Sequence, residues 1–196
     1  MSTREILAGA ILALFALRWV EYFALRTKTS SDKVLAKKNT IMTLLFGSAV
    51  WLTAGAEALL HSWEPVWVLS GAGGALYLLR FSLKLWAIRT LGAGWSTEIE
   101  IRDGHRLVRN GPYRWVRHPI YLCNILEPVA VAMIANGWVA ALLGSLLMWP
   151  TLFVRLRREE IALRSHFRED YESYRRDVPA LIPWKLPSRE VPAPRS

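Results

Sequence analysis

The stretch IYLCNILEPVAVAMIANGWVAALLGSLLMWPTLFV, residues 120–154, decides the fold that we predict for this chain. It holds two apolar segments of 17 residues each, Ile120–Asn136 and Trp138–Val154, which flank the turn signal Asn136-Gly137. A turn this short makes the two segments run antiparallel and side by side. Each segment approaches the roughly 20 apolar residues that a helix needs to cross a bilayer core. We therefore predict a tight helical hairpin within a membrane.

Three longer apolar segments precede the hairpin, at Ile6–Leu25, Thr40–Leu60 and Val66–Ile88. The composition agrees, because 53% hydrophobic residues, 10 Trp and a mean hydropathy of +0.20 are too apolar for a soluble domain of 196 residues. The lone Cys123 cannot form an internal disulfide, and no Cys/His cluster has metal-ligand spacing. We predict an all-α integral membrane protein with about five transmembrane helices and no metal site.

Lys and Arg lie almost entirely on one side of this five-span arrangement. Outside the spans, residues 26–39 carry five, residues 89–119 carry six and the tail from Arg155 carries ten, whereas the other side carries Arg4. Because cytoplasmic loops are enriched in Lys and Arg, we predict an outside N-terminus and a cytoplasmic C-terminus, in the inner or cell membrane if the protein is bacterial. The net charge of +9 then fits contact with membrane lipids and not with nucleic acid.

Ionisable residues also fall within or near the ends of the spans. Arg80 and Lys84 are close to the cytoplasmic end of the third span, so we expect their side chains to extend to the membrane surface. Glu127 lies deeper in the fourth span. Its carboxylate either lines a cavity or satisfies helix packing, and the sequence leaves both possibilities open.

The segment after the third span carries the densest sequence pattern. Its motifs are His105-Arg-Leu-Val108, Asn110-Gly-Pro-Tyr113 and Arg117-His-Pro-Ile-Tyr121, followed one hairpin later by Arg155 and Glu159-Glu160. In order and spacing, from about Gly92 to Pro183, these motifs resemble the isoprenylcysteine carboxyl methyltransferase family and its phospholipid-methylating relatives. The resemblance implies a membrane-embedded enzyme that uses S-adenosyl-L-methionine without a Rossmann fold. One departure is Cys123, where the relatives often have Gly or another small residue.

The resemblance also implies a cofactor pocket that faces the cytoplasm. Carried over by position, its cofactor-binding residues would be His105, Leu107, Val108, Tyr113, His118, Pro119, Tyr121 and Glu159. Arg155 would be the catalytic residue and would orient the methyl acceptor. Helical spacing independently places Arg155 and Glu159 on one face, with Glu160 turned roughly 100° away. An intrahelical salt bridge between Arg155 and Glu159 is the alternative interpretation.

These expectations divide the chain into a three-span region (1–91), a methyltransferase core (92–186) and a disordered tail (187–196). The resemblance implies methyl transfer to a lipophilic or lipidated acceptor, foremost carboxyl O-methylation of an isoprenylcysteine-like substrate. Methylating a carboxylate removes no proton, whereas a phospholipid amine or a thiol would need a base such as His118 or Glu127. A non-catalytic membrane binding module is a further alternative.

Overall fold

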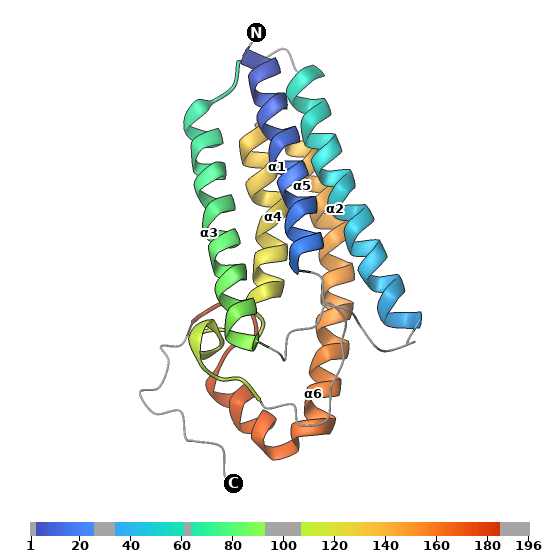
Figure 1. Cartoon of the computed structure of the whole chain (residues 1–196), viewed down its shortest axis with the longest axis vertical. Helices are drawn as coiled ribbons and strands as arrows, with labels where there is room; N and C mark the ends of the chain where they lie inside the picture. Colours follow the sequence, from blue (N-terminus) through green and yellow to red (C-terminus); the bar gives the residue numbers. More distant parts are fainter. Residues whose placement is uncertain (1–2, 26–33, 61–63, 93–106, 185–196) are drawn as a thin grey trace.

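The computed structural model describes residues 3–25, 34–60, 64–92 and 107–184, which form helices that run side by side (Figure 1). The helices are α1 (Thr3–Leu25), α2 (Val34–Leu60), α3 (Trp67–Leu91), α4 (Pro119–Ala135), α5 (Trp138–Leu143) and α6 (Trp149–Asp177). A 3-10 turn at Gly111–Arg114 precedes α4, and a π-helical turn at Gly144–Met148 joins α5 to α6. These ranges contain no strand. The all-α prediction is confirmed, while the predicted tail at 187–196 lies outside the described residues.

Three helical segments are long and apolar enough to cross a membrane by length and composition: Thr3–Ala24, Ile41–Leu60 and Trp138–Asp177. The shorter apolar helix α4 packs along α3 in the same bundle (Figure 1). The last of the three segments has 40 residues, about twice what a bilayer core requires. Its charged second half, from Arg155 onward, therefore extends beyond the membrane.

The turn between α4 and α5 forms at the predicted position. Asn136 ends α4 in the left-handed region, with a φ of 54°, which Asn adopts more readily than most residues. The Gly137 backbone N–H donates to the Ala132 carbonyl at 2.9 Å and closes the helix end. The Asn136 amide also accepts from the Val66 N–H at 2.9 Å and donates to the Ser70 hydroxyl at 2.6 Å. The hairpin is thereby attached to the beginning of α3.

A carboxylate from α2 caps the other side of this turn. The two oxygens of Glu57 accept the backbone N–H groups of Val139 at 3.0 Å and Ala140 at 2.8 Å. The first N–H groups of a helix have no intrahelical acceptor and attract negative charge. Glu57 therefore joins α2 to the start of α5.

Glu127 belongs to a buried ion-pair network that crosses the bundle. Arg18 Nε on α1 lies 2.6 Å from Glu127 Oε1, and the Trp51 indole N–H on α2 donates to the same oxygen at 3.0 Å. Arg80 Nη1 on α3 lies 3.6 Å from the other oxygen. Glu127 is 5% exposed. Its carboxylate is held by three neighbouring helices, which supports the helix-packing alternative.

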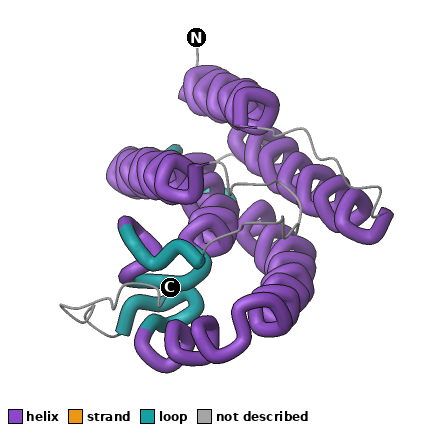
Figure 2. The backbone as a smooth tube through the Cα atoms, turned by 60° about the horizontal axis from the view of Figure 1, so that its bottom comes forward, coloured by secondary structure: helices purple, strands orange, loops and turns teal. Residues whose placement is uncertain are grey.

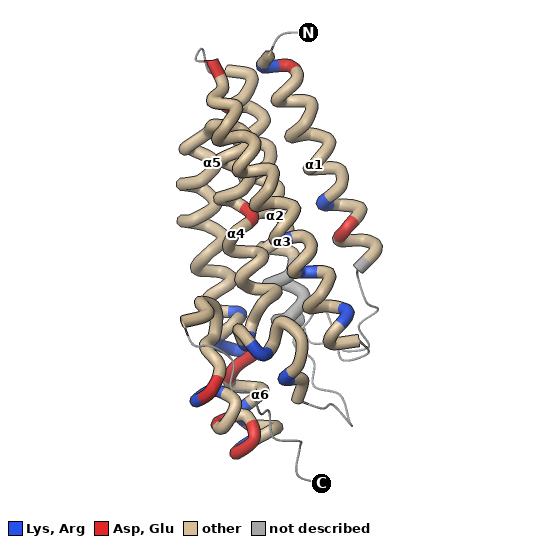
Figure 3. The backbone as a smooth tube through the Cα atoms, turned by 90° about the vertical axis from the view of Figure 1, so that its left-hand side faces the viewer, with Lys and Arg blue, Asp and Glu red and all other residues tan. Residues whose placement is uncertain are grey.

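The prediction that Arg80 and Lys84 extend to the membrane surface is wrong. Arg80 is 0% exposed, because Glu127 lies on one side and Glu21 Oε2 lies 3.6 Å away on the other. Lys84 pairs with Glu21 as well. Figure 3 shows that a few charged positions lie within the largely uncharged upper part of the helices, whereas many more gather on α6. Pairing lowers the large cost of a charge in the apolar interior, and α1 and α4 supply the partners.

The second half of α6 bends sharply at Arg168, whose φ of 46° and ψ of −118° are not helical. After the bend the chain curves back beneath the end of the bundle, towards the loop that precedes α4 (Figures 1 and 2). Tyr174 then donates from its hydroxyl to the Tyr113 carbonyl at 2.6 Å. Tyr171 donates to Glu160 Oε1 at 3.2 Å. The bend thus brings the last turns of α6 to the motif loop.

Candidate functional site

The Gly111–Arg114 turn delivers the chain to the beginning of α4. Gly111 has a φ of 56°, and a Cβ there would lie 2.7 Å from the hydroxyl of Thr90 on α3. Glycine is therefore required both for the backbone conformation and for the close approach to α3. Pro119 is the first residue of α4, where its missing N–H costs no helical hydrogen bond. These two motif residues set the position of His118 at the N-terminus of α4.

Tyr121 connects the two predicted functional residues of α6. Its hydroxyl donates to Glu159 Oε2 at 2.7 Å and accepts from Arg155 Nε at 3.1 Å. The ring of Tyr121 is buried and packs against Met148 and Leu152. The predicted common face of Arg155 and Glu159 is confirmed, since both side chains meet one hydroxyl group.

His118 and Tyr113 complete the surroundings of Glu159. His118 Nδ1 lies 3.9 Å from Glu159 Oε1, and the His118 ring meets the Tyr121 ring edge-on, with centroids 5.7 Å apart. Burial, with the nearby Glu159 carboxylate, raises the pKa of the Tyr113 phenol well above its ordinary value. The Glu159 side chain is 31% exposed, whereas that of His118 is 2% exposed. A partly accessible anion bordered by buried aromatic residues suits a ligand that carries positive charge.

The remaining predicted residues are less closely connected to this group. Pro119 is buried at the start of α4. Leu107 and Val108 are half-buried in the segment that leads to the 3-10 turn. Within the described part of the chain, no hydrogen bond or ion pair joins them to Glu159. His105 lies outside the described residues, so its cofactor contact stays a prediction.

Glu160, the second acidic residue of the motif, has a dense set of partners that sequence reasoning missed. Its Oε1 accepts from Arg117 Nη2 at 2.7 Å, Arg117 Nε at 3.1 Å, His118 Nε2 at 3.0 Å and Tyr171 at 3.2 Å. Arg175 Nε lies 3.5 Å from Oε2. Burial alone would raise the pKa of the Glu160 carboxyl, but hydrogen bonds from His118 and Arg117 lower it to about 2. Glu160 is therefore an anion at neutral pH.

The segment after α6, Val178–Ala180, pairs with the residues just before α4. The backbone N–H groups of Arg117 and His118 donate to the carbonyls of Pro179 at 2.9 Å and Ala180 at 3.0 Å. Arg117 Nη1 also donates to the Val178 carbonyl at 2.5 Å. We call Val178–Ala180 the closing segment. It holds the backbone of the Arg117-His118 pair, and Glu160 holds both side chains.

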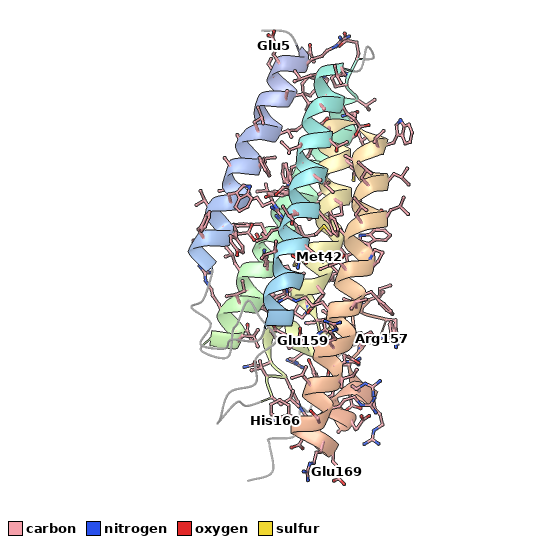
Figure 4. The ribbon with its side chains drawn as sticks, turned by 90° about the vertical axis from the view of Figure 1, so that its right-hand side faces the viewer. Glu5, Met42, Arg157, Glu159, His166 and Glu169 are labelled. Carbon is pink, nitrogen blue, oxygen red and sulfur yellow. The ribbon has the colours of Figure 1, made fainter. Side chains whose placement is uncertain are left out.

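The surface of α6 provides a contrast with the site. Figure 4 shows Glu159 on the bundle side of the helix and Arg157 on the opposite, outer side. Arg157 is exposed, and its guanidinium lies 4.7 Å from the centre of the Phe153 ring. Arg157 therefore carries the same charge as Arg155 on the same helix, but it lies on the outer side, away from the site that contains Tyr121.

Comparisons with known proteins identify the relatives of this chain. The model of the isoprenylcysteine carboxyl methyltransferase (ICMT) family matches residues 74–165, which include the described motif loop and the site residues on α6. The uncharacterised protein YpbQ of Bacillus subtilis is 36% identical over 117 residues, which are 59% of this chain and 68% of that protein. A protein-S-isoprenylcysteine O-methyltransferase of Schizosaccharomyces pombe is 39% identical over 79 residues, which are 40% of this chain and 34% of that enzyme.

A solved structure has the same fold. It is that of the eukaryotic intramembrane Ras methyltransferase ICMT without a monobody, and it matches with a TM-score of 0.61 at 21% identity. The match covers 90% of this chain and 65% of that chain. The aligned part of this chain spans about a third of the yeast enzyme and just under two thirds of the solved one. The prediction of an integral membrane fold is confirmed.

Proposed function

This chain belongs to the isoprenylcysteine carboxyl methyltransferase family, and we propose that it transfers a methyl group from S-adenosyl-L-methionine to a lipophilic acceptor. More specifically, we propose carboxyl O-methylation of an isoprenylcysteine-like substrate at the cytoplasmic membrane face. The observation that carries the proposal is the Tyr121 hydroxyl, which joins Arg155 to Glu159. Arg155, a cation suited to an acceptor carboxylate, and Glu159, an anion suited to the cofactor, are thus both hydrogen-bonded to the Tyr121 hydroxyl.

The residues around Glu159 fit S-adenosyl-L-methionine. That molecule carries a sulfonium and an ammonium group, and Glu159 offers a partly exposed carboxylate beside the buried rings of Tyr113, His118 and Tyr121. Together with the predicted contacts of His105, Leu107, Val108 and Pro119, these residues would hold the cofactor. When bound, it supplies a methyl group, whose bond to the sulfonium sulfur breaks as a new carbon–oxygen bond to the acceptor forms, and the sulfur becomes a neutral thioether. The protein contributes alignment and the exclusion of water.

Arg155 is suited to hold the acceptor. Its guanidinium offers a planar pair of donors that matches a carboxylate, and it stands one helical turn nearer the membrane than Glu159. A lipophilic acceptor arriving from the bilayer would meet Arg155 first. The carboxylate is already ionised at neutral pH, so this reaction needs no general base.

A phospholipid amine or a thiol is the alternative acceptor, and it would require a base. Glu127 is poorly suited to that role, because Arg18 and Trp51 hold its carboxylate within the bundle. His118 Nε2 is 3.0 Å from Glu160 and is engaged there. With Glu127 held within the bundle, an amine or thiol acceptor would have to use the other nitrogen of His118, Nδ1, as its base, whereas a carboxylate acceptor needs none.

Turnover of labelled S-adenosyl-L-methionine by the purified protein tests the proposal, with prenylcysteine, phospholipid and thiol acceptors supplied separately. We expect the label in the prenylcysteine product. Alkali should then release this label, because alkali hydrolyses a methyl ester. Arg155→Ala should abolish this product, while Arg157→Ala should retain it. Alkali-stable label on an amine or thiol would favour the alternative acceptor. Cofactor binding without turnover of any acceptor would favour a non-catalytic module.

We also propose the orientation with the N-terminus outside and the C-terminus in the cytoplasm. It is supported by the basic residues at 26–39, 89–119 and beyond Val154, which all fall on one side of five spans. A reporter that is active only in the cytoplasm should function when fused to the C-terminal end. Activity of a reporter specific for the opposite side, at the same position, would reverse the orientation.

A further inference from the structure

We propose that Glu160 is a positioning residue that determines which nitrogen of His118 carries the ring proton and which one accepts hydrogen bonds from the cofactor. By accepting the Nε2–H of His118, it leaves Nδ1 as a hydrogen-bond acceptor on the side of Glu159. This inference rests on the proposed cofactor site and deepens it. It assigns a role to a side chain that acts on the ligand through a neighbour.

The two nitrogens of His118 face different carboxylates. Nε2 is 3.0 Å from Glu160 Oε1, and Nδ1 is 3.9 Å from Glu159 Oε1. A neutral imidazole carries a proton on one nitrogen and a lone pair on the other, and its partners decide which. An ionised carboxylate can only accept, so the short contact with Glu160 requires the proton on Nε2. In the neutral imidazole, Nδ1 therefore presents its lone pair beside Glu159.

Glu160 can impose this tautomer because it is held as an anion in one place. Arg117 donates to it with two nitrogens, at 2.7 Å and 3.1 Å, and the Tyr171 hydroxyl donates at 3.2 Å. These charge-assisted hydrogen bonds favour the ionised form. The hydrogen bonds from His118 and Arg117 lower the pKa of the Glu160 carboxyl to about 2, against the opposing effect of burial.

The backbone of His118 is held independently of its ring. Its N–H donates to the Ala180 carbonyl at 3.0 Å, and the adjacent Arg117 N–H donates to the Pro179 carbonyl at 2.9 Å. The residue is 3% exposed, so water competes little for the ring. Turning the ring by 180° about its Cβ–Cγ bond would place the Cε1 atom where Nε2 lies, which would break the contact with Glu160 and leave a partly buried anion with one donor fewer.

The consequence is a pair of acceptors that face the ligand, Nδ1 of His118 and the carboxylate of Glu159. Such a pair matches a group with several donors, such as the ammonium group or the ribose hydroxyls of S-adenosyl-L-methionine. With the opposite tautomer, Nδ1–H would point a donor at those donors. Correct tautomer choice should therefore strengthen cofactor binding and have little effect on the acceptor.

Glu160→Gln tests the role because the amide has the same shape but can donate as well as accept. We expect about ten-fold weaker S-adenosyl-L-methionine binding, the order expected for one hydrogen bond to a charged group. The KM for the acceptor and the rate at saturating cofactor should change little. Glu172→Gln is the matched control, because Glu172 is on the same helix and pairs with Arg164 and Arg175. It should bind the cofactor like the wild type.

The tautomer itself can be measured by 15N NMR of the imidazoles at alkaline pH in detergent, with His118 assigned by its loss in His118→Gln. We expect protonated Nε2 and unprotonated Nδ1 in the wild type, and a mixture in Glu160→Gln. Protonated Nδ1 in the wild type would overturn the inference, even if Glu160→Gln does not fold. Wild-type cofactor affinity in folded Glu160→Gln would overturn it too. Failure of the wild type to bind the cofactor would instead refute the proposed function, since the tautomer is observed without ligand.

Discussion

Arg18 on α1 and Glu127 on α4 lie 109 residues apart in the chain and 2.6 Å apart in space. Both side chains are less than 10% exposed. The pair connects the first helix of the bundle to the helix whose N-terminal turn carries Tyr121. The position of the site therefore depends on a charge in the region that precedes the motifs.

Arg18→Met should destabilise the protein strongly. Removing one partner of a buried ion pair costs about 3–5 kcal/mol, because the remaining charge loses its nearest counter-charge. Thermal unfolding in detergent measures the effect, with the exposed Arg157→Met as control. The double variant Arg18→Met/Glu127→Gln should recover part of the loss, since the carboxylate that paired with Arg18 is then replaced by an uncharged amide. A wild-type unfolding temperature for Arg18→Met would show that the pair adds no stability.

Arg155→Lys should impair turnover and leave cofactor affinity nearly unchanged. Lysine keeps the charge but loses the planar pair of donors, so the acceptor carboxylate is held with less precise alignment. Misplacement of about 1 Å can lower a rate roughly a hundred-fold. Steady-state kinetics and calorimetric titration with S-adenosyl-L-methionine distinguish the two effects, with Arg157→Lys as the matched control. If the main defect is in cofactor binding, Arg155 does not orient the acceptor.

Arg168→Gly should unfold at the wild-type temperature or above it. A non-glycine residue with a φ of 46° and a ψ of −118° is strained by about 1–3 kcal/mol. Glycine removes that strain, although its greater freedom in the unfolded chain offsets roughly 0.5–1 kcal/mol. Arg168→Ala controls for the lost charge and should be no more stable than the wild type.

Arg168→Pro provides the opposite test of the bend. Proline restricts φ to about −65°, which is incompatible with the observed conformation. Tyr171 and Tyr174 could then not return to the motif loop, so cofactor binding should be lost. Cofactor titration checks this, and retained affinity in Arg168→Pro would show that the site does not need the bend.

The stability of the protein should fall in acid partly through Glu160. Its pKa in the folded protein is about 2, below the ordinary value of 4.5. A lowered carboxyl pKa contributes stability that is complete above the ordinary value and is lost as the pH falls towards the lowered one. The unfolding temperature of the wild type should therefore drop between these values, and that of Glu160→Gln should drop less. Parallel pH profiles for the two proteins would contradict the assignment.

The features that the sequence could predict depend on local spacing. Asn136-Gly137 is a short-range turn signal, and the hairpin forms where that signal lies. Arg155 and Glu159 are one helical turn apart, so their shared face followed from helix geometry. In both cases the residues that decide the outcome are neighbours in the chain.

The features that the sequence could not predict depend on contacts between distant segments. Arg80 seemed free to reach the membrane surface because its partners, Glu21 and Glu127, belong to other helices. The direction of Glu160 could be derived, but its contact with Tyr171 requires the bend at Arg168, where the chain has neither Gly nor Pro. A strained bend of this kind has no local sequence signal.

The closing segment determines when, during biosynthesis, the backbone of Arg117 and His118 acquires its hydrogen-bond acceptors. Chains are made from the N-terminus, so the spans and the motif loop exist before the ribosome has added Pro179 and Ala180. Until these residues are made, the backbone N–H groups of Arg117 and His118 lack these two acceptors. A ligand stabilises only the states that it binds. Under the proposed function, S-adenosyl-L-methionine would therefore bind after membrane insertion, which the helices would complete through their own packing and ion pairs.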